Sequence, residues 1–210
     1  MLPALRSSAG RTAAAGILLL LSFGPSCRPS RLRVIPVPPD VRTLEGYGTV
    51  KIVRAGESGR ARFSFVIESG RRGKFEVLDA FNRSAAEVFL APDAAYFVLR
   101  GEKAYWKAEP QDVVEKILGV RLGLVDVEGL LVGRPPGGPA GFDVRVRETF
   151  PGGSVPRRIE FSGLESEGTI TILALTFNTP PAGSVFDLDF LATHAAVPWA
   201  EMERFLRRED

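Results

Sequence analysis

The stretch FEVLDAFNRSAAEVFLAPDAAYF, residues Phe75–Phe97, decides the fold. Its alternating apolar and polar side chains predict two β-strands, Phe75–Asp79 and Ala86–Ala91, that run in opposite directions from a short turn. Turns between strands normally present Gly, Asn, Asp or Ser to water, whereas this turn carries Phe81. An aromatic side chain in that place either folds back onto its own sheet or projects toward something apolar.

Strand patterns dominate on both sides of this hairpin. The strands expected up to residue 108 are Leu44–Val53, Arg60–Glu68, Phe75–Asp79, Ala86–Ala91, Tyr96–Arg100 and Lys103–Ala108. Short turns connect them, so neighbouring strands are antiparallel and the segment is a meander. Further strands are expected at Phe142–Thr149, Arg157–Ser162, Thr169–Asn178 and Phe186–Phe190. The third of these is apolar or Thr on both faces, and we expect it to be covered on both sides.

Helical patterns interrupt the strands once. Pro110 and Asp112 open a helix in which apolar residues recur at helical spacing until Gly119 ends it. A second helical segment covers Val125–Val132, and a short C-terminal helix is expected at Pro198–Arg208. The first two helices have no layer of their own to pack against. We therefore expect them to cover the mouth or inner face of the sheet.

The fold class predicted from these elements is mainly β with a helical lid. About ten antiparallel strands curl into an incomplete β-barrel, which encloses an apolar cavity large enough for a small ligand. The residues expected to line the cavity are Phe63, Phe65, Ile67, Phe75, Val77, Val113, Ile117, Leu130, Leu131, Phe142, Val144, Val146, Phe186 and Leu188. The 14 Phe residues of the chain serve equally well in a plain core or in a cavity for acyl chains.

The composition is that of an ordinary globular protein, with 45% hydrophobic and 25% charged residues. Basic residues outnumber acidic ones by 27 to 25, and two of them, Arg6 and Arg11, belong to the N-terminal segment. The remaining chain is close to neutral and carries no footprint of nucleic-acid binding.

The N-terminus has the form of a bacterial secretion signal, residues 1–26. Arg6 and Arg11 precede an apolar run from Ala13 to Phe23, and small residues lead to Cys27, the only cysteine. We expect cleavage before Cys27 and attachment of lipid to it, the alternative being ordinary cleavage nearby. Residues 27–40 are rich in proline and form an extended tether. Residues 41–210 are expected to form a single domain.

Residues suited to catalysis or metal binding are scarce. His194 is the only histidine, so no two-histidine metal motif exists, and a loop position near the C-terminus predicts that it is solvated. Three glycine-containing segments resemble catalytic or nucleotide-binding motifs, but each is incomplete. Gly56–Arg60 lacks part of the nucleophile elbow, Gly46–Gly48 lacks part of the dinucleotide-binding motif, and Gly73–Lys74 lacks part of the phosphate-binding loop. Asp187 and Asp189 share a strand face that we expect to be exposed to solvent, which argues against a catalytic pair of carboxylates. We therefore expect no enzyme, no cofactor and no metal.

The pattern as a whole resembles the LolB type of outer-membrane lipoprotein receptor and its LolA/LolB relatives. The resemblance rests on the signal ending in Cys27, the Pro-rich tether, Gly46-Tyr47-Gly48, the turn Leu78–Asn82, the helices near 110–132 and the late Phe186-Asp187-Leu188. It implies an incomplete barrel whose cavity accepts lipoprotein acyl chains from a periplasmic LolA-like carrier. In that family a loop between early strands presents an exposed apolar residue needed for delivery, and Phe81 occupies the matching position, although Phe81-Asn82 replaces the more usual Leu-Gly.

The resemblance thus implies a monomeric lipoprotein, anchored by Cys27 at the periplasmic face of the outer membrane, that works without nucleotide or metal. Phe81 is the residue expected to touch membrane or lipid. An alternative from another class is a structural or assembly lipoprotein that uses the same barrel as a protein-binding scaffold. A periplasmic enzyme would need a polar cluster in the cavity, which the sequence does not reveal.

Overall fold

The computed structural model describes residues 36–79, 81–134, 142–163 and 165–207. The chain divides into two compact units, and all of these residues belong to the second, Val34–Asp210. The expected signal, residues 1–26, and the expected lipid-attachment residue Cys27 lie outside the described residues, as does most of the tether.

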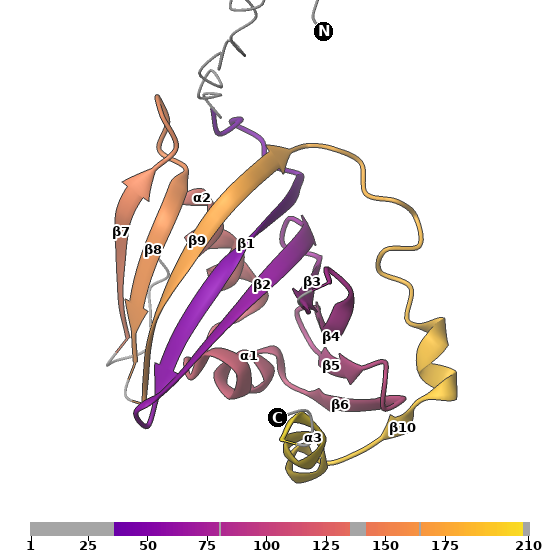
Figure 1. Cartoon of the computed structure of the whole chain (residues 1–210). Coiled ribbons are helices and arrows are strands. Elements are labelled where there is room, and N and C mark those ends of the chain that lie inside the picture. Colours follow the sequence, from indigo (N-terminus) through magenta and orange to yellow (C-terminus); the bar gives the residue numbers. More distant parts are fainter. Residues whose placement is uncertain (1–35, 80, 135–141, 164, 208–210) are drawn as a thin grey trace, which may run out of the picture. The chain divides into compact units, whose positions relative to one another are not determined.

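Ten strands of the described chain form one sheet (Figure 1). They are β1 (Thr43–Arg54), β2 (Glu57–Glu68), β3 (Arg72–Leu78), β4 (Ser84–Leu90), β5 (Ala95–Leu99), β6 (Ala104–Ala108), β7 (Asp143–Thr149), β8 (Pro156–Ser162), β9 (Ser166–Phe177) and β10 (Ala195–Ala196). The order across the sheet is β10-β6-β5-β4-β3-β2-β1-β9-β8-β7. Every neighbouring pair is antiparallel except β10 and β6. The sheet is open, since its end strands do not pair, and the predicted incomplete barrel is confirmed.

Glycines on the inner face allow the sheet to curl. A Cβ added at Gly46 would lie 2.8 Å from Cζ of Phe65, and one at Gly48 would lie 3.2 Å from the ring of Phe63. Each ring therefore lies over a glycine on the neighbouring strand. Glycine weakens a strand but permits a tight bend and close approach, and an aromatic ring across the pair restores the lost contact. The meander thereby curves around one apolar face.

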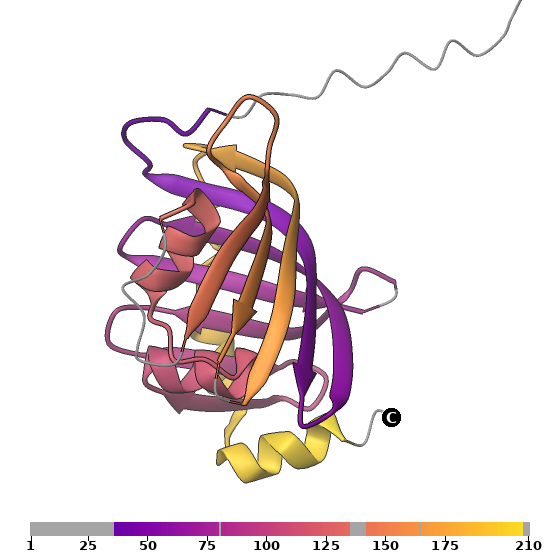
Figure 2. The same cartoon turned by 90° about the vertical axis from the view of Figure 1, so that its left-hand side faces the viewer.

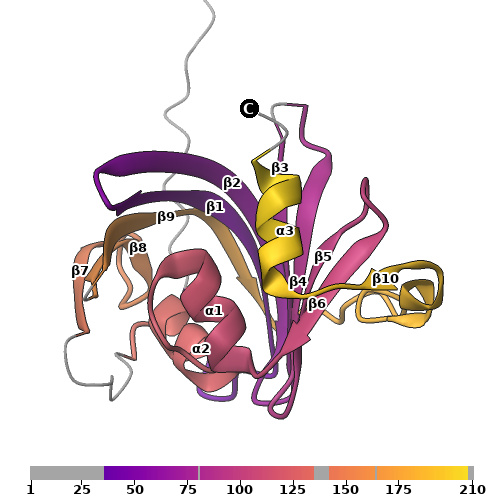
Figure 3. The ribbon, with the colours of Figure 1, turned by 90° about the horizontal axis from the view of Figure 1, so that it is seen from below.

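Within the described ranges, three α-helices accompany the sheet: α1 (Pro110–Leu118), α2 (Leu124–Val132) and α3 (Trp199–Leu206). Helix α1 ends at Gly119, whose φ of 76° is a left-handed conformation that glycine adopts without strain. Figures 2 and 3 show α1 and α2 on the inner side of the curled sheet. The predicted helical lid is thus present. None of the described helices combines the length and apolar character needed to cross a bilayer.

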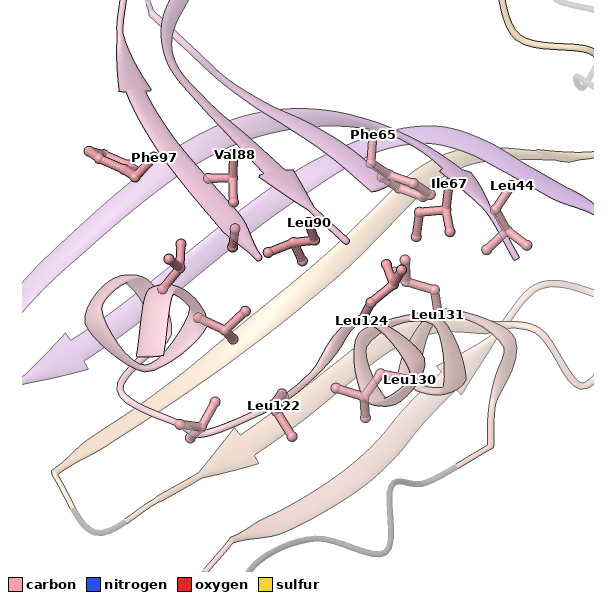
Figure 4. Packing of buried hydrophobic residues seen from close by; sticks show 14 of the residues in the cluster. Leu44, Phe65, Ile67, Val88, Leu90, Phe97, Leu122, Leu124, Leu130 and Leu131 are labelled. Carbon is pink, nitrogen blue, oxygen red and sulfur yellow. The ribbon is translucent and has the colours of Figure 1, made fainter. Parts of the chain in front are cut away.

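The core fills the space between these two helices and the sheet. In Figure 4, Leu122, Leu124, Leu130 and Leu131 lie on the helical side, and Leu44, Phe65, Ile67, Val88 and Leu90 lie on the strand side. Phe65 is 2% exposed and Ile67 is fully buried. Phe65 and Ile67 both point inward from β2, because alternate residues of a strand share one face.

One predicted strand is wrong. Phe186–Phe190 forms no strand, and its last two residues are instead the first two of a 3₁₀ helix, Asp189–Thr193. The carboxylate of Asp187 accepts a hydrogen bond from the backbone N–H of Asp189 at 2.8 Å. Asp side chains that satisfy nearby backbone groups in this way compete with the hydrogen bonds of a strand. The tenth strand is β10, five residues further along.

The expectation that β9 is covered on both faces is also wrong. Leu173 on its outer face is 48% exposed, whereas Ile172 and Leu175 are buried. A register shift between β1 and β9 at Tyr47 and Gly48 places Leu173 at a bulge, which turns this side chain outward.

The C-terminal strap, residues 185–198, passes from the outer face of the sheet around its β6 edge. The ring of Phe190 lies 5.9 Å from that of Phe89 on the outer face. Strand β10 then covers the β6 edge, and α3 places Trp199 against Trp106 on the inner face, 4.9 Å away. The strap therefore joins both faces and blocks one of the two sheet edges.

A buried carboxylate fixes the sheet beneath this strap. Glu87 of β4 is 3% exposed, and it forms ion pairs with Nζ of Lys74 at 3.2 Å and with Nε of Arg100 at 2.7 Å. The guanidinium of Arg100 in turn lies 4.0 Å from the centre of the Phe190 ring. Glu87 thus links β3 and β4 to the strap through Arg100, which directly follows β5.

Candidate functional site

An apolar pocket of 120 Å³ lies between α1, α2 and the inner face of the sheet. Every side chain that lines it is a hydrocarbon. The lining residues are Val50, Phe63, Phe75, Val77, Val88, Leu90, Val114, Ile117, Leu118, Leu122, Val127, Leu130, Leu131 and Ile170. With no polar side chain in its lining, the pocket offers a ligand burial of apolar surface and no hydrogen bonds through side chains.

Six of the residues that we expected in the cavity line this pocket: Phe63, Phe75, Val77, Ile117, Leu130 and Leu131. Phe65, Ile67 and Val113 are buried in the core beside it. Phe142 and Val144 are partly buried and pack against the core without lining the pocket. The strand residues come together because β2 and β3 present alternate side chains to the helices.

Three of the expected cavity residues lie elsewhere. Val146 is 45% exposed, since β7 is the last strand of the sheet. Phe186 lies on the outer side of β3, where the guanidinium carbon of Arg72 is 4.3 Å from the centre of the Phe186 ring. Leu188 precedes the 3₁₀ helix of the strap and is absent from the core cluster. Phe186 and Leu188 were misplaced because the strand predicted for them does not form.

Eight lining residues were absent from our prediction. They are Val50, Val88, Leu90, Val114, Leu118, Leu122, Val127 and Ile170. Val88 and Leu90 were within reach of the sequence, since they alternate with Glu87 and Phe89 in a predicted strand. Val50 and Ile170 required knowledge of the β1–β9 pairing, which sequence periodicity does not contain.

The turn between β3 and β4 presents Phe81 to solvent. Its side chain is 78% exposed, the largest value among the exposed large apolar residues of the described chain. Oδ1 of Asp79 accepts hydrogen bonds from the backbone N–H groups of Phe81 at 2.7 Å and Arg83 at 2.9 Å. Asn82 has a φ of 61°, a left-handed conformation that Asn tolerates. The backbone of the turn is therefore held in one arrangement while the aromatic ring projects.

Two arginines bind the turn that carries the exposed ring. Nε of Arg83 donates to Oδ2 of Asp79 at 2.7 Å, and its guanidinium lies 5.3 Å from the centre of the Phe81 ring. Arg62 of β2 donates to the backbone carbonyl of Asp79 at 2.8 Å. The hydrogen bond from the backbone of Arg83 and the Arg83 side chain hold the pKa of the Asp79 carboxyl below its usual 3.8.

The order of this turn is expected to depend on pH. Because its folded pKa is lowered, Asp79 stabilises the turn fully above pH 3.8, and this contribution disappears as pH falls through the lower folded value. In an NMR titration, the amide resonances of Phe81 and Arg83 should shift together with a midpoint below 3.8. Asp79→Asn should abolish that transition, and Asp93→Asn in the next hairpin should preserve it. A transition that persists in Asp79→Asn would contradict the role assigned to this carboxylate.

His194 is not the solvated residue that we expected. Its Nδ1 lies 3.0 Å from the carbonyl oxygen of Phe190, and its ring meets the Phe190 ring edge-on. Its Nε2 is buried with no hydrogen-bond partner in the structure. The imidazole therefore braces the 3₁₀ turn within the strap. In the described part of the chain, no three His, Cys, Asp or Glu residues gather as metal ligands.

The fold has relatives among solved structures, whereas the sequence matches no family model and no curated protein. A LolA superfamily protein from Nitrosomonas europaea superposes with a TM-score of 0.51 over 75% of this chain and 94% of its own, at 8% identity. A DUF1329 family protein from Desulfovibrio piger gives 0.52 over 73% and 92%, also at 8% identity. At this identity the likeness is one of fold, and it agrees with the LolA/LolB-type architecture expected from the sequence.

Proposed function

We propose that this protein is a lipid-anchored receptor that takes up acyl chains of lipoproteins beneath its helical lid and helps to insert them into the outer membrane. The apolar pocket carries the proposal, because acyl chains need apolar area and no specific hydrogen bonds. The shared fold with a LolA superfamily protein supports the choice of ligand.

The division of the chain fits this role. Cys27 would hold the protein at the periplasmic face of the outer membrane, residues 27–40 would serve as the tether, and residues 41–210 would act as a single monomeric domain. A LolA-like carrier would supply the acyl chains. Transfer would follow increasing affinity from carrier to pocket to bilayer, without nucleotide or metal.

The pocket must widen to accept an acyl chain. Its 120 Å³ is below the roughly 300–1,000 Å³ typical of sites for small molecules. Helices α1 and α2 meet the sheet mainly through packed apolar side chains, whereas the strands are joined by ladders of backbone hydrogen bonds. A few hydrogen bonds add to this packing: Ser166 of β9 donates to the Leu118 carbonyl, and Ser69 and Gly70 donate to Glu128. Separating the helices from the sheet is therefore the least costly way to open the site. The apolar surface exposed by this motion would be covered again by the ligand.

Filling the pocket should block uptake. In the full-length chain, Ile117→Trp places a larger side chain in the lining and should weaken binding of a fluorescent triacylated lipopeptide at least about tenfold, or about 1.4 kcal/mol. Leu173→Trp adds the same side chain on the exposed outer face of β9 and serves as the control. Both proteins should keep the circular dichroism spectrum of the parent.

Equal lipopeptide affinity of the two folded variants would refute acyl binding in this pocket. Native mass spectrometry separates the remaining possibilities. Lipid that co-purifies with the parent and is lost from Ile117→Trp supports the receptor. A stable protein partner without lipid supports the scaffold considered from the sequence.

A further inference from the structure

A group of cations adjoins the exposed ring of Phe81 on the outer face of β1 and β2. This cationic strip consists of Lys51, Arg60, Arg62 and Arg83, all of them exposed. Arg62 is hydrogen-bonded to the carbonyl of Asp79 at the start of the turn, and Arg83 lies over the ring itself. Arg60 lies two residues beyond Arg62, where β2 continues past its last pairing with β3. The strip therefore extends from the turn along the outer face.

The strip contains a pair that folding alone does not explain. Lys51 and Arg60 are direct partners across β1 and β2, and like charges in opposed positions destabilise a sheet. Among the described residues neither side chain has an ion-pair partner, although sixteen such pairs occur elsewhere. Glu167 is the nearest outer-face acid along β9, two residues from the partner of Lys51, and no ion pair joins it to Lys51.

Within the strip, the carboxylate of Asp79 is bound to Arg83. In the described chain, Lys51 and Arg60 thus add two positive charges without an ion pair on the face next to an aromatic side chain that is 78% exposed. Cations with an adjacent aromatic residue suit the surface of a bilayer, where the ring enters the headgroup region and the cations meet lipid phosphates.

We infer that the cationic strip and Phe81 together form a docking surface for a bilayer that contains anionic phospholipid. The surface orients the domain so that the turn between β3 and β4 meets the membrane while the strip lies along the headgroups. This inference rests on the proposed function for its cellular setting, but the surface acts on the bilayer rather than on the acyl chain in the pocket. Acidic proteins are the competing partners for a surface of this charge.

Neutralising the unpaired cations should weaken binding to vesicles. The experiment uses the full-length chain with Cys27→Ala, so that no lipid anchor is attached and the N-terminal region is the same in every protein. The probes are vesicles of phosphatidylcholine with or without phosphatidylglycerol. Each cation near an anionic surface contributes about a fivefold change in partitioning, so Lys51→Gln with Arg60→Gln should reduce sedimentation with anionic vesicles about 10- to 25-fold. Binding to phosphatidylcholine alone should stay unchanged.

The matched control removes the same charge elsewhere. Arg71→Gln with Arg157→Gln changes two exposed arginines, one in the turn between β2 and β3 and one on β8, and should keep the vesicle binding of the parent. Equal losses in both double variants, or none in the strip variant, would overturn the docking surface. Intact vesicle binding with lost binding of an acidic carrier protein would overturn it in favour of a protein partner.

The lipopeptide assay distinguishes failure of this inference from failure of the proposed function. Lys51→Gln with Arg60→Gln leaves the pocket lining untouched and should bind the lipopeptide as the parent does. If the lipopeptide binds but the vesicle effect is absent, the docking surface alone is refuted. If the vesicle effect is present but no lipopeptide binds, the acyl-binding pocket alone is refuted.

Discussion

Phe81→Glu should strongly slow delivery of lipoproteins to the membrane while leaving the folded protein intact. The ring is 78% exposed, and exposed substitutions generally change the free energy of unfolding by less than about 0.5 kcal/mol. Burying a phenylalanine in an apolar phase contributes about 1.5–3 kcal/mol, which is the contact that delivery would lose. A carboxylate at the same place must also be kept hydrated. Transfer of a lipopeptide from the protein to vesicles should therefore slow by at least about tenfold.

Two further variants make the result specific to an apolar contact. Phe81→Leu keeps an apolar side chain on the same turn and should retain most of the transfer rate. Leu173→Glu introduces the same charge at another exposed apolar position and should transfer as the parent does. Unfolding of Phe81→Glu would show that the ring is needed for stability, and full transfer would show that the membrane never meets it.

Glu87→Ala should destabilise the protein by about 3 kcal/mol, the largest effect on stability that we expect. Removing one partner of a buried ion pair leaves an uncompensated charge, which costs about 3–5 kcal/mol. Glu87 is 3% exposed, so Lys74 and Arg100 would lose a desolvated partner. Arg100 is 43% exposed and recovers some hydration, and Lys74 keeps its ion pair with Glu76, both of which favour the lower end of that range. Urea unfolding at neutral pH measures the difference.

The same variant should loosen the strap selectively. Arg100 no longer has a fixed position under the Phe190 ring, so hydrogen exchange in residues 186–196 should accelerate more than exchange in β1 and β2. Glu160→Ala is the control, because it removes an exposed ion pair in which the Glu160 side chain is 34% and the Arg147 side chain 50% exposed. It should lower the free energy of unfolding by no more than about 1 kcal/mol. If Glu87→Ala and Glu160→Ala lose equal stability, burial does not control the contribution of these carboxylates.

Local periodicity predicted the strands of the meander and the first two helices because each has one buried face. Phe63, Phe65 and Ile67 alternate along β2, and all three point to the inner face. Gly119 ended α1 where its left-handed φ requires glycine. Six lining residues of the pocket followed from these patterns, since a face shared along one element is a local property.

Periodicity predicted the wrong structure where a side chain formed hydrogen bonds with nearby backbone groups. It also failed where a residue's position depended on strands that pair from distant parts of the chain. Phe186–Phe190 alternates like a strand, but the Asp187 carboxylate caps its own turn. Val146 alternates like a core residue, but its strand lies at the edge of the sheet, away from the pocket. Partial burial of His194 depends on Phe190, whose own place on the sheet depends on Phe89 and Arg100. A series of contacts between residues far apart in the chain leaves no pattern in the amino-acid sequence around any one of them.

The pairing of β1 with β9 also governs the order in which the chain can fold. Strand β1 is synthesised long before β9, yet they are joined by eleven paired positions. Until residues 166–177 leave the ribosome, the long β1–β2 hairpin has one edge with unsatisfied backbone groups. Such distant pairing slows folding, and the exposed edge invites association with other chains. A chain interrupted before β9 would therefore aggregate, even though its meander and both lid helices were complete.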